Sequence, residues 1–202
     1  MFPMLHGLVS QGGATTLLQG LSWWFDFDEP SDGSGSVARL DSVAGESLTD
    51  NNTIASATDG SDTVASIVRA NSEYFSHANG AKWQAGNNEF TFVGWLKPKT
   101  LNVNAGYVAK TNEFVFNQSG TDPNFILYNG SGTIRAQVAA GAGLTNLATG
   151  AWYPFRFGYD KTRTRAFWQI GTGGLYYEKD TTGAPGTNTN AMFIGAFITQ
   201  YY

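Results

Sequence analysis

The 202-residue sequence predicts an all-β domain, arranged as a sandwich or a barrel. Three observations lead to this fold class. Short runs rich in aromatic and β-branched residues recur at intervals of roughly 8–12 residues, as strands do. Clusters of Gly, Asn, Asp, Ser and Thr separate these runs, which is typical of turns. No window of about 11 residues has the spacing of apolar residues that an amphipathic helix requires.

The first predicted strand is the aromatic run at residues 21–28, closed by a polar turn with Pro30 and Gly33. The other predicted strands lie at residues 90–96, 113–117, 125–128, 133–138, 152–159, 164–170, 176–179 and 191–197. The run at 90–96 is apolar on both faces, which fits a central strand of a sandwich. Residues 129–132 and 160–163 have the composition of hairpin turns. We interpret Asp59 and Asp62 as parts of another turn, with a weaker candidate calcium site as the alternative.

Composition excludes several functional classes. There is no cysteine, so disulfide scaffolds, thiol enzymes and cysteine-ligated zinc sites are excluded. The formal net charge is −4, which gives no reason to expect nucleic-acid binding. Basic residues such as Lys97, Lys99, Arg163 and Arg165 are scattered through predicted strands, and we interpret them as parts of solvated faces.

Residues 1–20 contain no Lys, Arg, Asp or Glu. They lack the basic start, the unbroken apolar run and the cleavage site of a signal peptide, so we expect a retained N-terminal arm. No stretch approaches the roughly 20 apolar residues of a membrane-spanning helix. The predicted organisation is therefore an arm at residues 1–20 and one domain at residues 21–202.

Several segments of this domain resemble the laminin-G-like, concanavalin A-like lectin and glucanase family. The matching segments are residues 23–29, 39–52, 71–76 (similar to N-x-x-Y-L-S), 90–98 (F-T-x-x-x-W-V-K-P), 150–153 (G-x-W-Y) and 192–196 (L-x-I-G). The resemblance covers about residues 21–197 and implies a two-sheet antiparallel jelly-roll sandwich. The family's usual closing strand, G-x-I-D-E-V-x-I-W, does not follow residue 197. Either this strand is shortened into residues 197–202, or another segment or chain covers the exposed sheet edge.

Glycoside hydrolases share this fold and need two carboxyl groups beside the scissile bond. Jelly-roll glucanases carry them in an E-x-D-x-x-E pattern, which this sequence lacks. The nearest acidic cluster, at residues 26–32, fits a polar turn that ends the first strand. We therefore expect no catalytic residues and no enzyme activity.

The same acidic cluster has a second interpretation as a calcium site. Ca²⁺ takes about six to eight oxygen ligands, often from loops of this kind. The candidate ligands are Asp26, Asp28 and Asp32, although Pro30 does not fit an EF-hand loop. Apart from these candidate calcium sites, we expect no cofactor and no metal.

Six tryptophans suggest stacking against sugar rings, but most of them lie in predicted strands. We expect Trp95, Trp152 and Trp168, with Trp23 or Trp24, to belong to the core or to be barely exposed. Trp83 lies in a polar loop before a strand and is the candidate anchor for a ligand or a protein interface.

The resemblance extends to stand-alone domains in bacteriophage structural proteins. Our leading interpretation is a non-enzymatic virion surface protein, either a capsid decoration protein or a tail-associated protein, present in several copies. The arm would anchor it to a capsid or tail protein, and the sandwich would face outward and aid host attachment. The alternative is a carbohydrate-binding adhesion module that binds a cell-surface glycan, and a glycoside hydrolase is the least favoured. The expected location is the virion surface, or otherwise the extracellular space.

Overall fold

The computed structural model describes residues 39–40, 47–60, 62–68, 71–79, 84–86, 89–99, 105–119, 122–139, 147–171 and 176–195. The chain divides into two compact units, Met1–His77 and Ala78–Tyr202, which are described separately. The expected arm, the first predicted strand and the residues after 197 lie outside the described residues. The division into an arm and one domain over residues 21–202 stays a prediction.

The described strands of the first unit all pair in antiparallel fashion. They are β1 (Arg39–Leu40), β2 (Ser47–Asn51) and β5 (Tyr74–His77), paired in the order β1-β2-β5, and the hairpin of β3 (Ala55–Asp59) and β4 (Asp62–Ser66). Alternate residues of β2 are buried, so Leu48 and Asp50 point to the same side. The Asp50 carboxylate accepts a hydrogen bond from the backbone N–H of Ile54 at 2.9 Å, which satisfies this buried acid.

The β3–β4 hairpin confirms the predicted turn at Asp59 and Asp62. These two residues are paired at the end of the hairpin, and Gly60 follows Asp59 with a φ of 66°. Glycine suits this position because a side chain is strained at positive φ. Asp59 therefore ends β3, and Asp62 begins β4.

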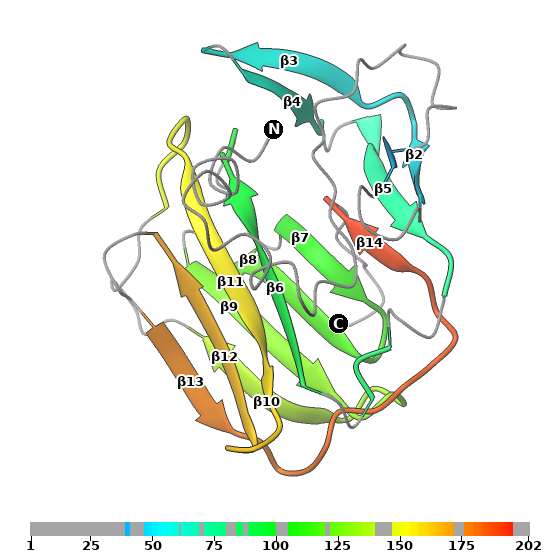
Figure 1. Cartoon of the computed structure of the whole chain (residues 1–202), viewed down its shortest axis with the longest axis vertical. Coiled ribbons are helices and arrows are strands. Elements are labelled where there is room, and N and C mark those ends of the chain that lie inside the picture. The colour runs from blue at the N-terminus through cyan, green and yellow to red at the C-terminus, as the bar shows by residue number, and fades with distance from the viewer. Residues whose placement is uncertain are drawn as a thin grey trace, which may run out of the picture. The chain divides into compact units, whose positions relative to one another are not determined.

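The second unit contains two antiparallel sheets (Figure 1). One has the order β13-β12-β11-β6, with β6 at Phe90–Leu96, β11 at Tyr153–Asp160, β12 at Arg165–Ile170 and β13 at Tyr176–Asp180. The other includes the consecutive neighbours β14-β7-β8-β9-β10, with β7 at Ala105–Lys110, β8 at Phe114–Ser119, β9 at Asp122–Tyr128, β10 at Ile134–Ala139 and β14 at Met192–Ile194. Figure 1 shows the strands of the first of these sheets lying over those of the second.

Phenylalanine rings fill the space between these two sheets. Phe157 of β11 is fully buried and stacks on Phe92 of β6 at a centroid distance of 4.8 Å. It also meets Phe116 of β8 at 4.7 Å and Phe125 of β9 at 5.1 Å. Because Phe116 and Phe125 belong to the opposite sheet, these contacts define the core of a two-sheet sandwich.

Trp168 connects the sheets by a hydrogen bond as well as by packing. Its side chain is fully buried on β12, and its indole N–H donates to the backbone oxygen of Val138 on β10 at 2.7 Å. The ring also stacks on Tyr177 of β13 at 4.5 Å. The expectation that Trp168 is a core residue is confirmed.

A fully buried ion pair lies beside the turn between β7 and β8. Lys110 Nζ donates to Glu113 Oε1 at 2.6 Å, and both side chains have 0% exposure. The Glu113 carboxylate also accepts the backbone N–H groups of Ala85 at 2.8 Å and Asn188 at 2.7 Å. These bonds satisfy the buried charge and attach two distant chain segments to the β7–β8 hairpin.

The predicted strands agree well with the described strands of the second unit. The predicted range 90–96 coincides with β6, and the hairpins at residues 129–132 and 160–163 are confirmed by the β9–β10 and β11–β12 pairs. The expectation that residues 90–96 form a central strand is wrong for the described sheet, because β6 lies at the end of the order β13-β12-β11-β6 and its Val93 is 57% exposed. No strand was predicted at 105–110, where the structure has β7.

Candidate functional site

The residues named from the sequence as binding candidates lie outside the described residues. This applies to the candidate calcium ligands Asp26, Asp28 and Asp32, and to the candidate anchor Trp83. Within the ranges that the structure describes, no group of three or more His, Cys, Asp or Glu side chains is placed to hold a metal ion. The candidate site must therefore be built from other residues.

The side chains of the sheet β13-β12-β11-β6 that point away from the sandwich core form what we term the outer face. Phe92 and Phe157 point inward to the opposite sheet, so their neighbours along each strand point outward. The outer face consists of Thr91, Val93, Trp95, Pro154, Arg156, Gly158, Asp160, Arg165, Phe167, Gln169, Tyr176, Glu178 and Asp180. Two of the large hydrophobic side chains that are exposed in the described structure, Val93 at 57% and Tyr176 at 37%, belong to it.

Strand register places four outer-face residues in one row across the sheet. Arg156 of β11 is paired with Val93 of β6 on one side and with Gln169 of β12 on the other. Gln169 is in turn paired with Tyr176 of β13. This cross-strand row, Val93–Arg156–Gln169–Tyr176, spans three strand spacings, or about 14 Å. It places an aliphatic group, a cation, an amide and an aromatic ring side by side.

Arg156 is held by its neighbours in the cross-strand row. Its Nε donates to Gln169 Oε1 at 2.7 Å. Its Cζ lies 5.6 Å from the centroid of the Tyr176 ring, within range of a cation–π interaction. These two contacts fix the plane of the guanidinium group while the residue remains exposed.

A second aromatic ring packs against Tyr176. Phe167 of β12 stacks on it at a centroid distance of 5.8 Å and an interplanar angle of 29°. Phe167 is opposite Gly158, and a Cβ atom added at Gly158 would lie 3.0 Å from Phe167 Cζ. The absence of a side chain at Gly158 thus leaves room for the ring that supports Tyr176.

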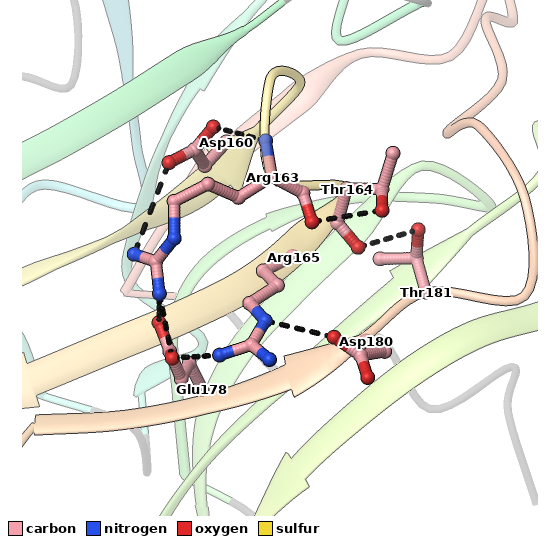
Figure 2. Close-up of polar contacts among 7 residues, drawn as sticks. All are labelled: Asp160, Arg163, Thr164, Arg165, Glu178, Asp180 and Thr181. Carbon is pink, nitrogen blue, oxygen red and sulfur yellow. Dashed lines mark hydrogen bonds and ion pairs between the residues drawn. The ribbon is translucent and has the colours of Figure 1, made fainter.

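An ion-pair cluster occupies the end of the outer face near the β11–β12 turn (Figure 2). Arg163 Nη2 contacts Glu178 Oε2 at 2.7 Å, and Arg165 Nη1 also contacts Glu178. Arg165 Nε donates to Asp180 at 2.8 Å, and the Asp160 carboxylate accepts the backbone N–H of Arg163 at 2.9 Å. Figure 2 shows both guanidinium groups turned toward Glu178. The negative charges of the three carboxylates in this cluster are therefore paired with the positive charges of its two arginines.

The contacts of this cluster shift the pKa of Glu178, one of its members, and the pKa of the neighbouring Tyr176. Desolvation is the largest single influence on the pKa of Glu178 and raises it, but hydrogen bonds from Tyr176, Arg163 and Arg165 together lower the pKa below its usual value. Desolvation, followed by hydrogen bonding with Glu178, raises the pKa of Tyr176. At neutral pH Glu178 is therefore ionised and Tyr176 keeps its proton.

Comparisons with known proteins give a structural likeness only. No protein-family model and no curated protein matches the chain. The binding domain of Paraclostridial Mosquitocidal Protein 1 matches with a TM-score of 0.55 and 7% identity, covering 84% of this chain and 48% of that chain. The receptor-binding domain of botulinum neurotoxin type G gives 0.49 and 13%, covering 85% and 45%. A CBM40 domain of the Ruminococcus gnavus IT-sialidase, bound to α2,3-sialyllactose, gives 0.46 and 12%, covering 58% and 68%.

The match to the binding domain of Paraclostridial Mosquitocidal Protein 1 identifies the fold. The chain has the concanavalin A-like jelly-roll fold. This confirms the fold that the segments at residues 71–76, 90–98 and 150–153 suggested. The chain spans about half the length of the two toxin domains that it matches.

One tryptophan of the jelly roll differs from its predicted position. Trp152, expected in the core, is 40% exposed, and Lys97 Nζ lies 5.8 Å from the centroid of its ring. It directly precedes β11, and Lys97 directly follows β6, so the two lie just beyond the Leu96–Tyr153 pair. Trp95 is half-buried, and its indole N–H has no hydrogen-bond partner among the described residues.

Local sequence patterns give little indication of which residues form the candidate site. Arg156, Gln169 and Tyr176 belong to three different strands, and only the register of those strands brings them together. Arg163 and Arg165 were expected on a solvated face, and the structure places them partly exposed in the ion-pair cluster. The alternation of inward and outward residues in β11 and β12 was the only signal that pointed to a common face.

Proposed function

We propose that this chain is a non-catalytic, lectin-like binding module that binds carbohydrate on its outer face. The observation that carries the proposal is the exposed cross-strand row. Sugars are bound by proteins through apolar contact with their C–H faces and hydrogen bonds to their hydroxyl groups. Val93 and Tyr176 offer the former, and Arg156 and Gln169 offer the latter.

The rigidity of the outer face supports this proposal. The four strands that carry the row rest on the phenylalanine core, and Arg156 and Tyr176 are each held by a neighbour. A site that is already ordered loses little conformational entropy when a ligand binds. The fold also agrees, because the mosquitocidal-toxin domain with the same fold is itself a binding domain.

Two of the described glutamates, Glu178 and Glu113, are unsuited to glycoside hydrolysis. Hydrolysis needs one carboxyl group that can donate a proton, with a raised pKa. The pKa of Glu178 is lowered instead, and this residue is engaged by two arginines. Glu113 is fully buried against Lys110, so it has no access to a substrate.

A glycan panel tests the proposed function. We expect the wild-type chain to bind at least one glycan and Tyr176→Ala to weaken that binding about tenfold, a loss of about 1.4 kcal/mol. Ile134→Ala is the matched control, because Ile134 is 48% exposed on β10 of the opposite sheet. Trp83→Ala tests the anchor named from the sequence. Failure to bind any glycan would overturn the proposal, and release of reducing ends from a polysaccharide would show an enzyme instead.

The placement of this module on a virion is a finer hypothesis, supported by the sequence resemblance to domains of bacteriophage structural proteins. In it, the lectin-like domain faces outward and residues 1–20 attach several copies to a capsid or tail protein. Deletion of residues 1–20 should then abolish incorporation into particles while glycan binding persists. Incorporation that is unchanged by the deletion would contradict the anchoring role of this segment.

A further inference from the structure

Arg156 differs from the nearby Arg163 and Arg165 in its partners. Arg163 contacts Glu178 at 2.7 Å, and Arg165 contacts both Glu178 and Asp180. Among the described residues, Arg156 forms no ion pair. Its hydrogen-bond partner is the neutral amide of Gln169, and its ring partner is Tyr176. The face therefore presents one guanidinium charge that no described carboxylate neutralises.

The hydrogen-bonding geometry leaves the end of this guanidinium group available. An arginine has five N–H donors in a planar fork, and Arg156 uses the one on Nε for Gln169. Within the described structure the two terminal nitrogens carry no further hydrogen bond. A planar pair of N–H donors matches the two oxygens of a carboxylate, which can accept both at once.

The surroundings of Arg156 favour a single carboxylate on a largely neutral molecule. Its neighbours in the cross-strand row are the uncharged side chains of Val93, Gln169 and Tyr176. A phosphate dianion would favour a second cation beside Arg156, and the row contains none. The row also runs across four strands, whereas an extended peptide pairs along a strand edge.

We infer that the outer face binds an acidic oligosaccharide, with Arg156 as the anchor for the sugar carboxylate. The sugar's apolar surface then lies against Val93 and the exposed part of Tyr176, and Gln169 holds the arginine in position. This assignment rests on the proposed function and names the ligand class of the same site. The about 14 Å length of the row gives room for a short oligosaccharide rather than for one ring alone.

Paired ligands that differ only in a free carboxylate test the assignment. The pairs are oligogalacturonate with its methyl ester and sialyllactose with its methyl ester, each measured by calorimetry with the full chain. The acidic member of at least one pair should bind at least tenfold more tightly than its neutral partner. Charge-assisted hydrogen bonds of this kind give a change of about 10- to 100-fold.

Variants assign the effect to Arg156. Arg156→Gln should remove the preference for the acid, and Arg156→Lys should retain part of it because lysine keeps the charge but lacks the fork. Lys179→Gln is the control, since it removes an exposed charge from β13 outside the cross-strand row. Unchanged circular dichroism and Tm show that each variant is folded.

The outcomes separate this inference from the proposed function. Equal binding of acid and neutral partner, or an acid preference that survives in Arg156→Gln, overturns the carboxylate anchor but leaves a lectin. Tighter binding of a glutamate-rich peptide than of any acidic glycan overturns the ligand class. Absence of binding to every glycan, neutral ones included, overturns the proposed function itself.

Discussion

Gly158, in the middle of β11, shows how one residue supports the outer face. A Cβ atom at this position would lie 2.1 Å from the backbone oxygen of Phe90 and 3.0 Å from Thr91 Cα, both on the neighbouring strand. The backbone at Phe90 cannot move as freely as a side-chain end. Phe167 Cζ, also 3.0 Å away, belongs to the ring that stacks on Tyr176. Glycine is thus required here, because a side chain would collide with the backbone of β6 and with the ring of Phe167.

Gly158→Ala should therefore destabilise the chain and weaken glycan binding together. Overpacking of this kind costs about 1–3 kcal/mol, and displacement of Phe167 would disturb Tyr176. The measurement is the free energy of unfolding in urea, combined with calorimetry of the glycan found in the panel. Gly150→Ala is the comparison, since its Cβ atom would meet nothing within 4 Å and only its φ of 77° is strained. An equal loss of stability in both variants would contradict the steric argument.

At the scale of elements, the buried Lys110–Glu113 pair decides where two irregular segments lie. Neither Ala85 nor Asn188 belongs to a strand, yet both backbone N–H groups bond to the Glu113 carboxylate. Lys110 neutralises that carboxylate, and its Nζ also lies 3.5 Å from the backbone oxygen of Asn188. Because an unpaired buried charge is costly, these segments and the β7–β8 hairpin depend on one another.

Lys110→Met should lower the free energy of unfolding by about 3–5 kcal/mol, because it leaves the Glu113 carboxylate buried without its cation. Hydrogen exchange should show lost protection at the amides of Ala85 and Asn188. The double variant Lys110→Met with Glu113→Gln should recover part of the loss, since no charge is then buried. Simple addition of the two single effects would show that the residues are not coupled. Lys179→Met, on an exposed side chain, should change stability by less than about 0.5 kcal/mol.

For the whole molecule, the sequence predicts the parts of the jelly roll that local patterns determine. Runs such as residues 90–96 are strands because aromatic and β-branched residues follow one another between turn residues. Local patterns do not predict β7, because Ala105, Gly106 and Lys110 are poor strand formers. Its last residue is buried only because Glu113 pairs with it and Asn188 covers it.

The candidate site was harder to predict than the fold because it depends on contacts between segments that are distant in the sequence. An apolar run such as Phe90–Leu96 suggests burial on both faces, but nothing in it shows that Val93 is 57% exposed in the folded chain. Arg156 and Tyr176 are 20 positions apart, and their contact depends on how β11, β12 and β13 pair. Register is a property of the assembled sheet, so the cross-strand row becomes visible only in the structure.

A ligand that binds the native chain and not the unfolded one must stabilise the whole molecule. At a free ligand concentration 100 times the Kd, mass action adds about 2.7 kcal/mol. In a chain of this size, 1 kcal/mol shifts the Tm by about 2–4 °C, so an acidic glycan at that excess should raise the Tm by about 5–11 °C. Differential scanning calorimetry measures this shift. The methyl-esterified glycan, and the Arg156→Gln variant with the acidic glycan, should both give a much smaller rise. An unchanged Tm at saturating acidic glycan would show that the native outer face does not bind it.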